Sequence, residues 1–131
     1  MLHHISIGAQ EIDRAVRFYD ATLAPLGYVR VWSDLRPGET EQAVGYGPIG
    51  SGDKLAVKQV AQPIAYMPGF HIAFSAPNRA AVIAFYSAAL ATGGTDNGQP
   101  GLRPDYGPNY FAAFVVDPEG YRLEAVCKAA A

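Results

Sequence analysis

The sequence contains very little of several features that would restrict its function. It has a single cysteine, Cys127, in 131 residues, so no internal disulfide can form. Its longest apolar run, from Tyr110 to Val116, is far shorter than the ~20 residues that a membrane-spanning helix needs. The chain also lacks the basic start and apolar segment that are typical of a signal peptide. These absences predict a cytoplasmic protein that has no membrane partner.

Charged residues are sparse as well. They make up 17% of the chain, the formal net charge is −2, and Lys and Arg form no cluster. This pattern excludes the basic footprint of a nucleic-acid-binding protein. Hydrophobic residues account for 50% of the chain, which is enough for a core and too many for a disordered segment. The length and composition predict a single domain over residues 1–131.

The chain contains an internal repeat with an offset of 67 residues. Residues 4–27 and 71–94 align without a gap and share nine identities in 24 positions. The identities include His4 with His71 and Gly27 with Gly94. Repeat units of about 1–62 and 69–128 follow, joined by a proline-containing linker over residues 61–69.

Each unit shows the pattern of one strand, one helix and three further strands. Apolar residues at helical spacing predict helices near residues 11–25 and 78–92, with Pro77 in the first turn of the second. Alternating or apolar runs predict the strands. In the first unit these are residues 4–8, 28–33, 41–47 and 54–60, and in the second they start at residue 71 and continue near 95–99, 110–116 and 121–127. The predicted fold class is α+β, with two β-α-β-β-β units that form paired mixed sheets around a cavity.

Two histidines begin the first strand of the two units. Strand alternation puts His4 on the same face as Ser6 and Gly8, and His71 on the same face as Ala73 and Ser75. A histidine among small residues, opposite an apolar face, is typical of a cavity wall. The pattern leaves open whether the cavity forms within one chain or between two. An incomplete cavity and the apolar composition predict a homodimer.

The sequence resembles the vicinal oxygen chelate superfamily, which includes glyoxalases, bleomycin resistance proteins and extradiol dioxygenases. The motif from His4 to Gly27, its copy from His71 to Gly94, and the segment from Phe114 to Glu124 carry this resemblance. The resemblance implies that His4, His71 and Glu124 bind a divalent metal (zinc, manganese, iron or nickel) and that Glu124 is also catalytic. A set of two histidines and one carboxylate leaves positions open on the metal for a small-molecule substrate.

The sequence departs from this family at two points. Residues 54–59 supply no acidic or histidine side chain for the fourth ligand of glyoxalase I, and Lys58 lies there instead. Lys58 would either contact an anionic substrate or remain solvated. Phe114 and Gly107 replace the tyrosine and histidine of extradiol dioxygenases, which argues against ring cleavage by that mechanism.

The segment 101–110 is expected to form the mouth of the cavity, because it is rich in rigid and aromatic residues. Arg103 would bind a carboxylate or phosphate of the substrate, or else pair with a nearby acid. Tyr106 and Tyr110 are expected to contact the ligand. Trp32, Tyr46 and Phe111 are expected in the core.

Two functions are consistent with these residues. The first is a metal-dependent enzyme, a lyase, an isomerase or a ring-opening enzyme, that acts on a substrate with adjacent oxygens. The second is a metal-free protein that sequesters a small molecule, as the bleomycin resistance members do. The retained histidines and Glu124 favour the enzyme.

Overall fold

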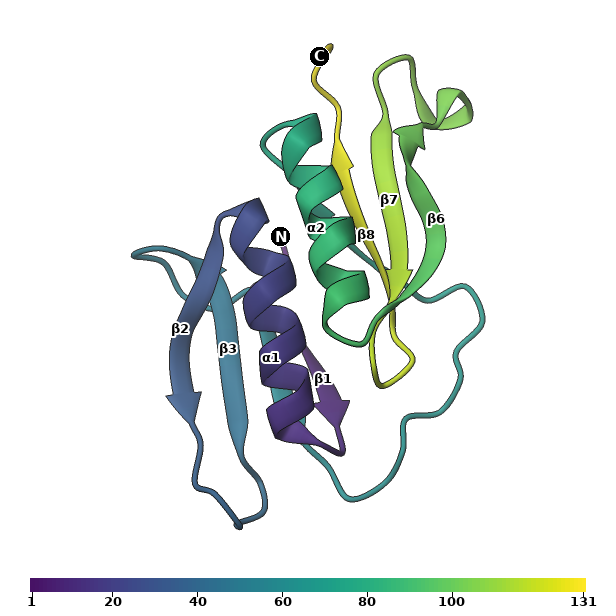
Figure 1. Ribbon diagram of the computed structural model, residues 1–131. Helices are drawn as coiled ribbons and strands as arrows, with labels where there is room; N and C mark the ends of the chain where they lie inside the picture. Colours follow the sequence, from purple (N-terminus) through teal and green to yellow (C-terminus); the bar gives the residue numbers. More distant parts are fainter.

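The computed structural model describes all of residues 1–131 and contains two successive β-α-β-β-β units (Figure 1). The first comprises β1 (Ile5–Ala9), α1 (Ile12–Leu23), the short 3₁₀ helix η1 (Ala24–Leu26), β2 (Tyr28–Asp34), β3 (Ala43–Pro48) and β4 (Leu55–Gln59). The second comprises β5 (Ile72–Ser75), α2 (Arg79–Ala91), β6 (Thr95–Leu102), η2 (Pro104–Tyr106), β7 (Phe111–Val116) and β8 (Arg122–Cys127). The predicted repeat and its element order are therefore confirmed.

Each unit forms its own mixed four-stranded sheet. The strand orders are β1-β4-β3-β2 and β5-β8-β7-β6, in which the first strand of each unit pairs in parallel with the last. The remaining pairs are antiparallel. Figure 1 shows α1 and α2 beside one another in the middle of the molecule, with β2 and β3 on one side and β6 and β7 on the other. The α+β fold class predicted from the repeat is confirmed.

The two helices begin differently. α1 has no side-chain cap at Glu11, whereas the side chain of Asn78 accepts a hydrogen bond from the backbone N–H of Ala81 and caps α2. Pro77 was predicted in the first turn of the second helix, and this placement is wrong because it precedes the cap. Asn is a preferred N-cap residue, and its cap satisfies a backbone N–H that would otherwise be unpaired at the start of the helix.

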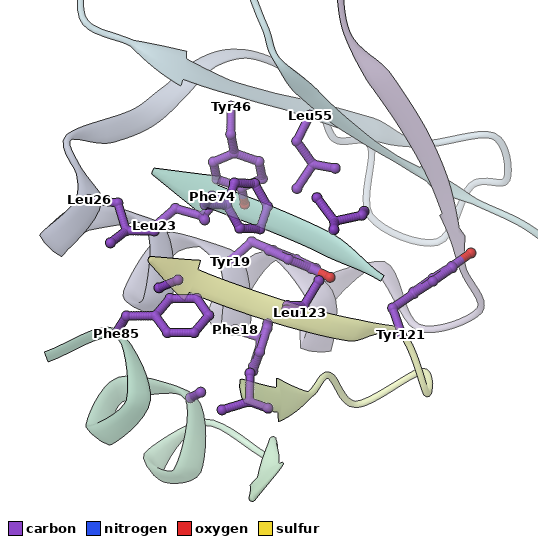
Figure 2. Close-up of a cluster of buried hydrophobic side chains, with 14 of the residues drawn as sticks. Phe18, Tyr19, Leu23, Leu26, Tyr46, Leu55, Phe74, Phe85, Tyr121 and Leu123 are labelled. Carbon is purple, nitrogen blue, oxygen red and sulfur yellow. The ribbon is translucent and has the colours of Figure 1, made fainter. Parts of the chain in front are cut away.

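The helices and one face of each sheet share a single core of 24 buried residues. Figure 2 shows Phe18 and Tyr19 of α1 among side chains from both units, including Leu55 of β4 and Leu123 of β8. Because strand residues alternate, this arrangement leaves each sheet with a second face that no helix covers. We call these the first and second helix-free faces. The first carries Ser6, Gly45, Ala56 and Lys58, and the second carries Arg122, Glu124 and Phe114.

A buried polar contact also joins the two units. The Tyr19 hydroxyl of α1 donates a hydrogen bond to the Asp117 carboxylate in the turn between β7 and β8. The other carboxylate oxygen of Asp117 accepts from the backbone N–H groups of Glu119, Gly120 and Tyr121. These hydrogen bonds fix the turn at residues 117–120 against the first unit. None of the helices is long and apolar enough to cross a lipid bilayer.

Candidate functional site

The second helix-free face carries a buried carboxylate, Glu124, at the middle of its sheet. Glu124 lies opposite Ala73 of β5 on one side and Phe114 of β7 on the other. Its flanking residues Leu123 and Ala125 point the other way, into the core. The side chain of Glu124 is only 3% exposed. An acidic side chain with so little contact with water requires polar partners on the same face.

Glu124 has one partner on each carboxylate oxygen. Nε2 of His71 lies 3.0 Å from Oε1, and the Tyr110 hydroxyl donates a hydrogen bond to Oε2. Burial and the neighbouring carboxylate raise the pKa of Tyr110 to about 12. Tyr110 is therefore protonated at neutral pH and acts as a fixed donor to Glu124. The ring of His71 remains partly accessible, with 46% of its side chain exposed, beside this buried carboxylate.

Beside this cluster lies a pocket of about 510 Å³ that residues of the second unit alone line. Arg103 lies over the ring of Phe114, with 5.4 Å between its guanidinium carbon and the ring centroid. The guanidinium donates to the carbonyl of Gln99 and forms no ion pair, so the expected alternative of a nearby acid is wrong. Tyr106 also lines the pocket, and its ring packs edge-on against Tyr110 at 5.3 Å.

Gly98 of β6 makes this pocket possible. Its φ of +148° is one that side-chain-bearing residues rarely adopt, and it lies opposite Phe114. A Cβ at this position would lie 3.0 Å from the Phe114 ring and 3.3 Å from Nη2 of Arg103. The absence of a side chain at Gly98 therefore allows both groups to approach the strand.

The first helix-free face is different in character. Small residues form much of its surface, and Lys58 is exposed there without an ion-pair partner. Trp32 was predicted in the core, and this prediction is wrong. The residue is 39% exposed, and its indole lies over Gly45 on the neighbouring strand. A Cβ on Gly45 would lie only 2.2 Å from Nε1 of this indole. Tyr46 is buried as predicted, and Phe111 packs partly buried against the core.

His4 lies apart from the Glu124 cluster within the chain. Its Nδ1 lies 2.8 Å from Nδ1 of His3, and both histidines are exposed; the partly buried Asp53 is the third member of this group. No other group of three or more His, Cys, Asp or Glu side chains has ligand atoms that all lie within 4.8 Å of one another. One chain thus brings together His71 and Glu124 of the predicted ligand set, and His4 belongs to a different cluster.

The donors of the second helix-free face suit a divalent metal. An imidazole nitrogen and a carboxylate oxygen 3.0 Å apart are of the types that bind zinc and its neighbours. The Tyr110 hydroxyl on the other oxygen of Glu124 is the kind of outer contact that orients a ligating carboxylate. The residues present therefore fit a metal, although two protein ligands alone leave it incompletely held.

Sequence reasoning missed three contributors to this face. Arg122 lies on the same face of β8 as Glu124, and Tyr66 of the linker contacts it. Alternation along β8 predicts the face of Arg122, but Tyr66 is 56 residues away and no pattern connects it. The role of Gly98 was equally hidden, because a glycine in a weak strand resembles a turn residue.

Comparisons with known proteins agree with this architecture. The family model for the Glyoxalase/Bleomycin resistance protein/Dioxygenase superfamily matches residues 1–125. A glyoxalase/bleomycin resistance protein from Albidiferax ferrireducens is 25% identical, with a TM-score of 0.76 over 96% of this chain and 97% of its own. A glyoxalase I mutant from Zea mays is 21% identical, with a TM-score of 0.71 over 95% of this chain and 45% of its own.

A third similar structure is that of the fosfomycin resistance protein FosX from Mesorhizobium loti. It is 18% identical, with a TM-score of 0.67 over 96% of this chain and 90% of its own. At this identity the likeness shows the fold alone. No curated protein matches the sequence of the chain.

Proposed function

The chain belongs to the Glyoxalase/Bleomycin resistance protein/Dioxygenase superfamily, and from this premise we propose that it is a metal-dependent enzyme acting on a small molecule with adjacent oxygens. The single observation that carries the proposal is the pairing of His71 with the buried carboxylate of Glu124 at the centre of the second helix-free face. A partly exposed imidazole beside a buried carboxylate offers both ligand types of the predicted set.

The third ligand, His4, would come from a second copy of the chain. Within one chain it clusters with His3 and Asp53 rather than with His71 and Glu124. A twofold symmetric dimer that places the first helix-free face of one copy against the second helix-free face of the other would form two identical sites. Each site would then contain His4 and Lys58 from one copy and His71 and Glu124 from the other. The separation of His4 from His71 and Glu124 within one chain supports the proposed homodimer.

A divalent metal held there would act as a Lewis acid on the substrate oxygens. The chain's own residues have separate roles around it. Glu124 would hold the metal through one carboxylate oxygen, while Tyr110 donates to the other and fixes its direction. Because the pKa of Tyr110 is raised to about 12, it remains a donor through the neutral range. Glu124 would also be the carboxylate placed to accept a substrate proton, in accordance with its predicted catalytic role.

A second function has one observation in its favour. Both oxygens of Glu124 already have partners without a metal, and an aromatic pocket lies next to them. A metal-free binding protein would use the same pocket to hold an aromatic compound. The two proposals differ in whether Glu124 is required for metal binding or only for the architecture of the face.

Calorimetric titration of chelator-treated protein with Zn²⁺ and Mn²⁺ separates them. We expect one metal per chain, with binding weaker by about 100-fold or more in Glu124→Gln and His71→Ala. Glu41→Gln, an exposed change of the same type, is the matched control and should bind as the wild type does. Equal binding by all four proteins, or no binding tighter than about millimolar, would reject the enzyme proposal and favour the binding protein.

A further inference from the structure

A second cluster of metal-ligand side chains lies outside the proposed active site. His3, His4 and Asp53 each offer one ligand atom, and these atoms all lie within 4.8 Å of one another. None of the three residues forms an ion pair. His71 and Glu124 are not part of this cluster, so its chemistry does not depend on the second helix-free face.

The pairing of β1 with β4 brings the three residues together. These strands run parallel with Ile5 opposite Leu55, and the backbone N–H of Ile5 donates to the carbonyl of Lys54 at 2.9 Å. Residues that precede the two strands therefore lie at the same end of the sheet. His4 precedes Ile5, and Asp53 lies two residues before Leu55. The sheet thus holds the carboxylate beside the histidines, although they are far apart in the sequence.

The two histidines lie before β1, so strand alternation does not send their side chains to opposite faces. The rings of His3 and His4 meet edge-on, with centroids 5.0 Å apart, and their Nδ1 atoms are 2.8 Å apart. A hydrogen bond between two Nδ1 atoms requires that one of them carries no proton. A divalent ion takes the place of the shared proton when both nitrogens are unprotonated, since metal ligands must be deprotonated.

The spacing of the ligand atoms suits an ion between them. An ion at the centre of three atoms no more than 4.8 Å apart lies within about 2.8 Å of each, so shifts of less than about an ångström reach bond lengths of about 2.0–2.2 Å. Two bonds of about 2.0 Å at right angles separate their nitrogens by about 2.8 Å, whereas tetrahedral bonds separate them by about 3.3 Å. The 2.8 Å between the Nδ1 atoms of His3 and His4 therefore matches a tetragonal ion better than a tetrahedral one.

We propose that His3, His4 and Asp53 form a second metal site, which binds Cu²⁺ through the two imidazoles and the carboxylate. Tetragonal coordination by nitrogen and oxygen is typical of Cu²⁺, and Cu²⁺ binds such ligands most tightly among the divalent first-row metals. Water would fill the remaining positions, since both histidines are exposed. The site needs one chain only and does not rest on the proposed function. Because both sites use His4, Cu²⁺ bound here would withhold that side chain from the proposed active site.

The double variant His71→Ala/Glu124→Gln isolates this site, because it lacks both ligands that one chain gives to the proposed active site. Calorimetric titration of this variant with Cu²⁺ should show one ion per chain, with a dissociation constant of about micromolar or tighter. Adding His3→Ala or Asp53→Asn should weaken binding by about tenfold or more, since even the loss of an outer-shell contact has effects of this size. Adding Asp105→Asn makes the same exchange at an exposed position of η2 and should have no effect.

Electron paramagnetic resonance provides a readout that a general loss of stability would not produce. The Cu²⁺ spectrum of the double variant should show nitrogen couplings from two imidazoles, and adding His3→Ala should leave one. Equal Cu²⁺ affinity after adding His3→Ala, Asp53→Asn or Asp105→Asn would overturn the proposal, because it would show adventitious binding only. Binding no tighter than about millimolar in the double variant would overturn it as well. Neither result bears on the proposed function, which the Zn²⁺ titrations of the wild type test separately.

Discussion

Each helix-free face pairs an aromatic ring with a glycine on the neighbouring strand, but the strands that carry the ring and the glycine are exchanged between the two faces. In the first unit the aromatic residue, Trp32, is on edge strand β2 and the glycine, Gly45, is on β3. In the second unit the glycine, Gly98, is on edge strand β6 and the aromatic residue, Phe114, is on β7. Each glycine gives the ring opposite it room to lie against the sheet. The two units thus share a fold but place the aromatic ring at different positions across the sheet. One ring is on the edge strand, and the other is beside Glu124.

The polar groups of the two faces differ more strongly. The second face contains a buried carboxylate with two partners, and two arginines without acidic partners. The corresponding part of the first face contains small residues and the exposed Lys58. The repeat therefore explains the shared scaffold of the two units. The residues on the helix-free faces differ between the units, and this difference explains why the polar groups gather on the second face. Neither face by itself contains the whole predicted ligand set.

Among changes outside the ligands themselves, the largest effect is expected from the hydroxyl that supports Glu124. Tyr110→Phe removes the donor to one carboxylate oxygen, and outer-shell changes of this kind typically weaken metal binding by about 10–100-fold. Tyr106→Phe is the matched control, because the Tyr106 side chain is 66% exposed and contacts Tyr110 only through its ring. Calorimetry with Zn²⁺ measures both variants. Unchanged affinity in Tyr110→Phe would show that Glu124 needs no second partner.

The next largest effect is expected on the free energy of unfolding, when Asp117 on the helix-covered side loses its hydrogen bond from Tyr19. Burial raises the pKa of Asp117, whereas the hydrogen bond from Tyr19 lowers it. Because the folded-state pKa is raised, Asp117 contributes stability at low pH that is lost as the pH rises through that pKa. Tyr19→Phe removes a stabilising donor, so its cost should grow from pH 4 to pH 7 and reach about 1–3 kcal/mol.

Denaturant unfolding at the two pH values measures this difference. Tyr86→Phe is the control, because its hydroxyl interacts with Asp96 at a more exposed place. We expect little change with pH in that variant. If the cost of Tyr19→Phe were the same at pH 4 and pH 7, the ionised carboxylate of Asp117 would not be what Tyr19 stabilises.

The smallest effects concern the paired glycines. Gly98→Ala is expected to lower the free energy of unfolding by about 1–2 kcal/mol, because its φ of +148° disfavours alanine and the added Cβ would lie 3.0 Å from the Phe114 ring. Gly45→Ala should cost less, since Trp32 lies at the surface and can rotate away. Trp32 is the sole tryptophan, so its fluorescence should shift to longer wavelength in Gly45→Ala. A larger stability loss at Gly45 than at Gly98 would reverse the comparison of the two faces.

The sequence was sufficient for the architecture because the repeat and the helical spacing are local signals. Helix α1 and helix α2 lie within one or two residues of their predicted bounds. Strand β6 was underestimated, because Gly98 and Pro100 resemble chain breakers. It extends to Leu102 as an edge strand, where shifts of register accommodate both residues. Identical residues in the repeat also differ in burial, since Leu23 is fully buried and its counterpart Leu90 is 42% exposed.

The site was less predictable than the fold. The family resemblance pointed to Glu124 as a site residue, but the sequence did not predict its partners, and its side chain is nearly fully buried. Its contact with Tyr110 depends on the register of β7 against β8, which a sequence pattern does not fix. The placement of Trp32 on a sheet surface depends on a glycine of the neighbouring strand, again through register. Contacts set between strands, rather than along one, were therefore the ones missed.

Mixing two defective variants tests the central claim, that one metal site uses ligands from two copies. His4→Ala and Glu124→Gln should each fail to bind Zn²⁺ tightly when alone. After joint refolding at equal amounts, mixed dimers would contain one intact site each, and tight binding should return to about one quarter of the wild-type stoichiometry. Calorimetric titration of the mixture measures this recovery. No recovery in the mixture would contradict the account, as would full Zn²⁺ binding by His4→Ala alone.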